Sequence, residues 1–152
     1  MSGSATPRVS VIIPHWNGRR HLDDCLNALR RQTLADHEVI LVDNGSTDGS
    51  QSIVCEHFPE VRLIELGANR GFTGACNAGY AASRGEFICL LNNDTEADPD
   101  WLAAIVDVFD RHPDVCLPRG VDDGAGACDI FFNQRHAIGQ ALGEPAQRRG
   151  VD

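Results

Sequence analysis

Two aspartates stand just beyond apolar runs of the kind that form buried strands. Asp43 follows Glu38–Val42 directly, and Asp94 follows Glu86–Leu91 after two asparagines. A carboxylate in the position of Asp43 can accept a hydrogen bond from a ribose hydroxyl or from a base N–H. The backbone amides of residues 45–49, ahead of an expected helix, can donate to an anion. The pattern around Asp43 therefore predicts a nucleotide site.

Asp94 lies in a short acidic stretch that also holds Glu96 and Asp98. Mg²⁺ takes one or two protein carboxylates and completes its shell with phosphate oxygens and water. Asp94 is therefore predicted to hold a divalent cation that bridges to a nucleoside diphosphate. Neither acidic loop has the spacing of an EF-hand calcium loop, which excludes that kind of site. The Asp48 and Asp98 carboxylates are assigned to helix caps instead.

Four polar loops carry these groups, and three of them are rich in glycine. They span residues 14–18, 43–50, 67–74 and 92–98. Taken singly, each loop has the composition of an ordinary turn or helix cap. Four such loops at one edge of a sheet favour a site for a polar ligand. In the first loop, Trp16 could stack on a ligand base or simply pack against the protein.

The elements that must position these loops alternate along the chain. Strands are predicted at 9–13, 38–42, 61–65 and 86–91, and helices at 20–33, 49–58, 73–84 and 99–111. Strands joined through helices form a parallel sheet by right-handed crossovers, with helices on both faces. The predicted fold class is therefore α/β with a mostly parallel sheet. In such a sheet, ligands bind beyond the carboxyl ends of the strands.

The character of the chain changes near residue 118. Residues 8–117 are predicted to form one α/β domain, and residues 118–152 an irregular tail or a remnant of a longer unit. Within the latter, a strand is expected at 130–132 and a weak helical pattern covers 135–142.

Composition excludes several other chemistries. The 152 residues include 13 basic and 22 acidic residues, a net charge of −9, and all the basic residues are arginines. Without lysine, neither a P-loop nor Schiff-base catalysis can operate. An acidic surface disfavours nucleic acid as a partner. Because no apolar run has the length of a membrane span and no leader peptide is visible, the expected location is the cytoplasm.

Four segments of the chain resemble glycosyltransferases of family 2. They are residues 9–14 with Asn17, residues 38–50, residues 69–72 with 77–79, and residues 90–95. The last, Leu-Asn-Asn-Asp-Thr, is most similar to the bacterial rhamnosyltransferase-like branch. The resemblance covers about residues 8–117, with all four motifs in the right order and spacing.

This resemblance implies a GT-A fold with a Rossmann-like nucleotide-binding half, a UDP- or dTDP-sugar donor, and transfer with inversion at the anomeric carbon. It also implies a divalent metal, Mg²⁺ or Mn²⁺. The metal would be held by Asp94, since Asn92 replaces the first acid of the family's D-x-D motif. The residues it marks for the nucleotide sugar are Pro14, Asn17, Asp43, Asn69, Gly71, Asn77, Asn93 and Asp94.

The family's general base and acceptor site are expected in a further stretch of chain, so no catalytic residue is named here. The leading hypothesis is a glycosyltransferase, incomplete in this chain, that acts on a glycan or lipid-linked acceptor for polysaccharide synthesis. Such an acceptor would bring the protein to the inner face of the membrane. The alternative is a non-catalytic nucleotide-sugar-binding module or inactive remnant. Apolar faces left uncovered would favour self-association.

Overall fold

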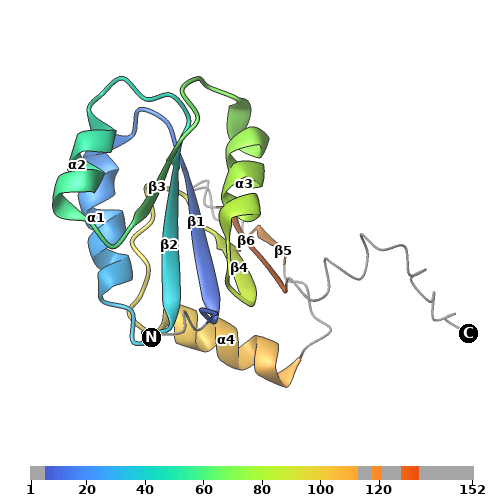
Figure 1. Ribbon diagram of the computed structural model, residues 1–152. Helices are drawn as coiled ribbons and strands as arrows, with labels where there is room; N and C mark the ends of the chain where they lie inside the picture. Colours follow the sequence, from blue (N-terminus) through green and yellow to red (C-terminus); the bar gives the residue numbers. More distant parts are fainter. Residues whose placement is uncertain (1–5, 113–117, 121–127, 134–152) are drawn as a thin grey trace, which may run out of the picture.

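The computed structural model describes residues 6–112, 118–120 and 128–133. Strands and helices alternate through the first of these ranges, as predicted, and all eight elements are visible in Figure 1. In chain order they are β1 (Val9–His15), α1 (Arg19–Arg30), β2 (His37–Asp43), α2 (Ser50–His57), β3 (Arg62–Glu65), α3 (Gly71–Ala82), β4 (Phe87–Leu90) and α4 (Trp101–Arg111).

The first four strands form a parallel sheet in the order β3-β2-β1-β4, which confirms the predicted fold class. β1 is central, and Val9 at its start pairs with His37 of β2 and with Phe87 of β4. At the other end of β1, His15 pairs with Asp43. All four carboxyl ends therefore open onto the same edge of the sheet, and the strand order reverses between β1 and β4.

Two further strands extend the sheet beyond β4. β6 (Cys128–Asn133) pairs antiparallel with β4, and β5 (Pro118–Gly120) pairs antiparallel with β6. β6 confirms the strand expected at 130–132, whereas the composition around 118–120 did not predict a strand. The division of the chain near residue 118 stays a prediction, and the helical pattern at 135–142 lies outside the described residues.

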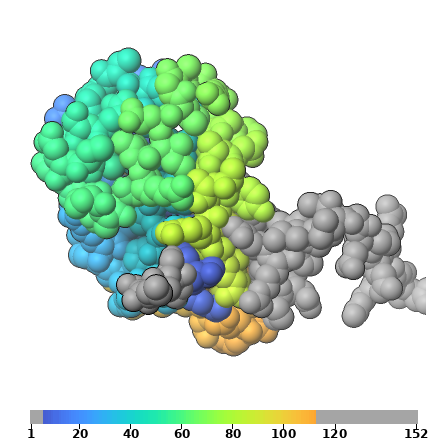
Figure 2. Space-filling view, in the orientation of Figure 1, coloured from blue at the N-terminus to red at the C-terminus, as the bar shows by residue number. Residues whose placement is uncertain are grey.

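The sheet is buried on both faces because alternate residues of each strand point to opposite sides. Val9, Val11 and Ile13 pack with α1, α2 and α4, and Ile12 packs with α3 on the other face. Figure 1 shows α1 and α2 on one side of the sheet and α3 on the other. Figure 2 shows the outer surfaces of α2, β3 and α3, in teal through yellow-green, as adjoining parts of one face.

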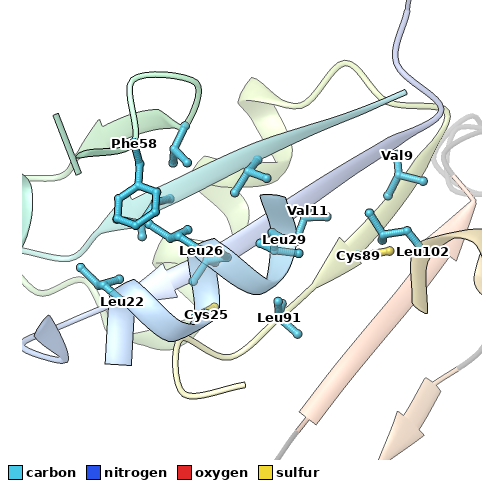
Figure 3. Packing of buried hydrophobic residues seen from close by; sticks show 14 of the residues in the cluster. Val9, Val11, Leu22, Cys25, Leu26, Leu29, Phe58, Cys89, Leu91 and Leu102 are labelled. Atoms are coloured by element: carbon cyan, nitrogen blue, oxygen red, sulfur yellow. The ribbon is translucent and has the colours of Figure 1, made fainter. Parts of the chain in front are cut away.

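α1 contributes a continuous apolar stripe to the larger cluster. Leu22, Leu26 and Leu29 are each no more than 1% exposed, at the three- and four-residue spacing of one helix face. Figure 3 shows them beside Phe58, which follows α2. Burying each leucine contributes about 1.5–3 kcal/mol, so this stripe is a main reason why α1 lies on the sheet.

α1 ends at Arg30, three residues before the predicted end. Beyond the end of the helix, the buried side chain of Gln32 binds both α4 and the segment that leads into it. Its amide nitrogen donates to the Asp98 carbonyl at 2.7 Å, and its amide oxygen accepts from the Leu102 N–H at 3.0 Å.

Over the described ranges, no helix is both long and apolar enough to cross a membrane.

Gly79 lies where α3 approaches the sheet most closely. A Cβ at this position would stand 2.3 Å from Ile12 Cγ2 and 3.1 Å from Val42 Cγ2. In the sequence, only a glycine within a predicted helix indicates this contact, and a glycine alone does not predict close packing.

Gly79→Ala should therefore destabilise the protein by about 1–3 kcal/mol through overpacking, although alanine favours a helix more than glycine does. Urea unfolding followed by circular dichroism measures the change. Ala81→Ser, at an exposed position of α3, is the control and should shift stability by less than about 0.5 kcal/mol. A Gly79→Ala protein as stable as the wild type would contradict the close packing.

Candidate functional site

The loops that follow β1 and β2 are tied together by Asn17. Its side-chain oxygen accepts from the Thr47 N–H at 2.8 Å, and its own N–H donates to Ser46 Oγ at 2.9 Å. Asn17 adopts a positive φ of 50°, which asparagine tolerates better than most residues. Asn17 is one of the residues that the resemblance marks for the ligand. Its side-chain oxygen binds the neighbouring loop.

Asn44 joins the loop after β2 to the loop before α3. Its amide nitrogen donates to Asn69 Oδ1 at 3.0 Å and to the Gly71 carbonyl at 3.1 Å. Its amide oxygen accepts from the Arg70 N–H at 2.7 Å. Asn44 is 5% exposed. Sequence reasoning missed this residue, because an asparagine beside a strand end looks like any other turn residue.

A cleft of about 270 Å³ opens between these loops. Its lining residues are Pro14, His15, Trp16, Asn44, Asn69, Gly71 and Phe72. The structure thus brings together three residues marked by the resemblance, Pro14, Asn69 and Gly71. Trp16 and Phe72 are 56% and 52% exposed, so each offers an aromatic surface to a ligand. Phe72 was not predicted.

Asp43 is 1% exposed at the end of β2, next to Asn44 of the cleft. Its Oδ2 accepts from the Ser46 N–H at 3.1 Å and from Gln51 Nε2 at 2.9 Å. Its Oδ1 is buried without a hydrogen-bond partner among the described residues. A buried carboxylate oxygen in this state costs free energy, and a carboxylate can only accept. An N–H or O–H donor close to Oδ1 would satisfy this oxygen.

His15 links the end of β1 to the loop after β4. Its ring is 1% exposed, with Nδ1 at 2.8 Å from Asn93 Nδ2 and Nε2 at 2.8 Å from Ser50 Oγ. The Ser50 hydroxyl also binds the Asp48 carboxylate. Burial lowers the pKa of His15, although the negative charges of Asp48 and Asp43 act to raise it. The ring is therefore neutral at pH 7.

Asp48 and Asp98, assigned to helix caps from the sequence, lie just outside the N-cap residues, which are Gly49 for α2 and Asp100 for α4. Asp48 accepts from the first N–H of α1, that of Arg19, at 2.9 Å, and from the first N–H of α2, that of Ser50, at 3.1 Å. Partial burial acts to raise the pKa of Asp48, but these bonds and the Ser50 hydroxyl outweigh it and hold that pKa below its usual value. Asp98 accepts from the Asp100 N–H at 2.9 Å, just before α4.

Asp94 is exposed in the turn that follows β4, and Asn77 is exposed on α3, outside the residues that line the cleft. Among the described residues, no group of three or more His, Cys, Asp or Glu side chains could hold a metal. Burial raises the pKa of the nearby Cys25 thiol to about 12, so it stays protonated. An exposed single carboxylate such as Asp94 would leave most of a cation's ligands to phosphate and water.

Comparison with known proteins identifies the family to which the chain belongs. The family described as Glycosyl transferase family 2 matches residues 10–136. An uncharacterized glycosyltransferase of Nostoc sp. is 39% identical over 140 residues, which cover 90% of this chain and 43% of that protein. The chondroitin synthase of Escherichia coli is 35% identical over 106 residues, or 68% of this chain and 15% of the relative. The chain thus spans less than half of these relatives.

Two solved structures share the fold. A mannosyltransferase from Pyrobaculum calidifontis, in complex with GDP-Man and Mn²⁺, superimposes with a TM-score of 0.73 at 25% identity, covering 98% of this chain and 50% of that one. Residues 1–349 of S. aureus TarS, in complex with UDP, give 0.65 at 26% identity, covering 70% and 33%. The predicted GT-A architecture is thereby confirmed.

Asn44→Ala removes three hydrogen bonds between the two loops and should destabilise the protein by about 1–3 kcal/mol. Urea unfolding measures the loss. Asn27→Ala, in α1 and away from the cleft, is the matched control and should be neutral or slightly stabilising, because alanine favours a helix. Equal effects of the two substitutions would contradict a special role for Asn44.

Proposed function

The chain belongs to glycosyl transferase family 2, and on that basis we propose that it binds a nucleotide-sugar donor and supports transfer of the sugar to an acceptor hydroxyl. The observation that carries this proposal is the buried, unpartnered Oδ1 of Asp43 beside the cleft. A uracil or thymine base offers an N–H, and ribose offers hydroxyls, that would satisfy this oxygen. We therefore propose a UDP- or dTDP-sugar as the donor.

The remaining donor contacts are proposed from the cleft and from the resemblance. Pro14, Asn69 and Gly71 line the cleft and would contact the nucleotide, with Trp16 offering a face for stacking. Asn17, Asn77 and Asn93 are also proposed to contact the nucleotide sugar. Solved relatives in complex with UDP, UDP-GlcNAc and GDP-Man support a nucleotide sugar as the ligand class.

Asp94 is proposed to hold Mg²⁺ or Mn²⁺ together with the donor diphosphate. A bound divalent cation would supply positive charge to a leaving diphosphate. The Mn²⁺ complex of the Pyrobaculum relative supports this use of a metal. Because two of the proposed site residues are acids, such a cation would offset their repulsion of the diphosphate.

The proposed reaction inverts the anomeric centre, as in the rhamnosyltransferase-like branch. An acceptor hydroxyl loses its proton to a carboxylate and attacks the anomeric carbon while the bond to the diphosphate breaks. No described residue is proposed as this base. The second candidate is a non-catalytic nucleotide-sugar-binding module or inactive remnant. Sugar transfer by the chain to any acceptor would exclude that second candidate.

The acceptor, the location of the protein and its self-association are also matters of proposal. The acceptor is proposed to be a glycan or a lipid-linked glycan in polysaccharide biosynthesis. The protein is proposed to act in the cytoplasm, peripheral to the inner membrane face. Self-association through uncovered apolar surface also stays a proposal, and analytical ultracentrifugation would test it by showing a monomer or a larger species.

Asp43→Asn should weaken UDP binding about tenfold or more, because the amide replaces a charged acceptor that the ligand satisfies. Calorimetric titration of the full chain with UDP in excess Mn²⁺ measures the affinity. Asp24→Asn, at an exposed acid of α1, is the matched control and should bind as the wild type does. Absence of wild-type binding at millimolar UDP would overturn the proposed function.

Asp94→Asn should reduce UDP affinity in Mn²⁺ to the level that the wild type shows in EDTA, because the substitution removes the one carboxylate assigned to the metal. The same titration in EDTA should give equal affinities for the variant and the wild type. Glu96→Gln, an exposed acid two residues further along the same loop, is the control. An equal loss of UDP affinity in both variants would show that the overall charge of the loop, and not Asp94, holds the metal.

A further inference from the structure

The hydrogen bonds around His15 have a single possible direction. The Asp48 carboxylate can only accept, so the one hydroxyl proton of Ser50 is donated to Asp48. Ser50 Oγ must then accept from His15, which places the ring proton on Nε2. In the neutral ring Nδ1 is therefore an acceptor, and it accepts from the amide nitrogen of Asn93. Each of these four side chains thus has a fixed role.

We propose that His15 is a positioning residue, which holds the Asn93 side chain and thereby orients the turn that carries Asp94. This inference rests on the proposed function only for its consequence in donor binding. The chain of hydrogen bonds itself connects the loop after β4 to the starts of α1 and α2, through a ring at the end of the central strand.

Gly18 supports this role independently. A Cβ at residue 18 would stand 2.3 Å from Asn93 Nδ2 and 3.3 Å from His15 Cε1. Any side chain at this position would therefore displace the Asn93 amide from the ring. The absence of a side chain at the start of α1 leaves the space that the contact between His15 and Asn93 occupies.

The loop after β4 is attached separately at its far end, where Gln32 Nε2 donates to the Asp98 carbonyl at 2.7 Å. There the Thr33 N–H donates to the Pro99 carbonyl at 2.9 Å. At the near end the turn around Asp94 is closed by the Thr95 N–H, which donates to the Asn92 carbonyl at 3.2 Å. The near end is also held by Cys25, whose thiol donates to the Asn92 carbonyl at 3.8 Å. Loss of the His15 contact should therefore loosen the near end more than the far end, and the two amides report on the two ends separately.

The neutral state of His15 is consistent with its surroundings. Burial lowers the pKa of the ring, against the opposing charges of Asp48 and Asp43. A neutral ring buried to this degree needs both nitrogens paired, and Asn93 and Ser50 supply the two partners. The position of Asn93 is therefore coupled to the core through His15 and does not depend on the turn alone.

Amide exchange followed by NMR in the ligand-free full chain tests the proposal. His15→Phe should accelerate exchange of the Thr95 amide about tenfold or more and leave the Thr33 amide within twofold. Asn93→Ala should do the same and keeps the test valid where His15→Phe fails to fold, because Asn93 is outside the core. The double variant should show no further acceleration, since both substitutions break one contact.

A merely structural role predicts a different result. If His15 only stabilised the fold, both amides would accelerate together, and that result or an unchanged Thr95 amide would overturn the proposal. Titration with UDP and Mn²⁺ is the second arm, in which both variants should bind about three- to tenfold more weakly. If the wild type binds no UDP, the proposed function fails, whereas the Thr95 and Thr33 amides still decide the role of His15.

Discussion

β1 pairs in parallel with both β2 and β4, and this pairing fixes where the polar loops of the molecule meet. Both neighbours run in the same direction as β1, so all three carboxyl ends meet at one edge. The strand is buried on both faces, which leaves its end as the place where polar groups can gather. The register that sets His15 beside Asp43 therefore also determines which loops can touch.

The polar residues at this edge divide into two groups with different physical roles. Asn17, Asn44 and Asn93 bind other loops, and their amides satisfy backbone or ring groups that burial would otherwise leave unpaired. Asp43 differs because one of its oxygens is buried without a partner. The first group ties the loops of this edge together, and the unpaired oxygen lies among these loops, next to Asn44 of the cleft.

The electrostatics of the edge agree with the proposed ligand only in combination with a cation. The chain carries a net charge of −9 and no lysine, so a diphosphate is not attracted by the protein as a whole. Backbone amides and a metal at Asp94 would provide the local positive charge. Asp48 has a different role, because both of its oxygens accept hydrogen bonds from the starts of α1 and α2.

The amino-acid sequence predicts the alternation of strands and helices, the burial of both sheet faces and the four loops at the carboxyl edge, because apolar periodicity is a local property and the alternation implies parallel strands. The family resemblance adds Pro14, Asn69 and Gly71 of the cleft. What Asn44 and Asn93 bind, the burial of His15 and the strand at 118–120 are known from the three-dimensional structure. The physical reason is distance along the chain: an asparagine has the same local signal in any turn. Its hydrogen-bond partner, 25 residues away for Asn44 and 78 for Asn93, is set by how the sheet brings the loops together.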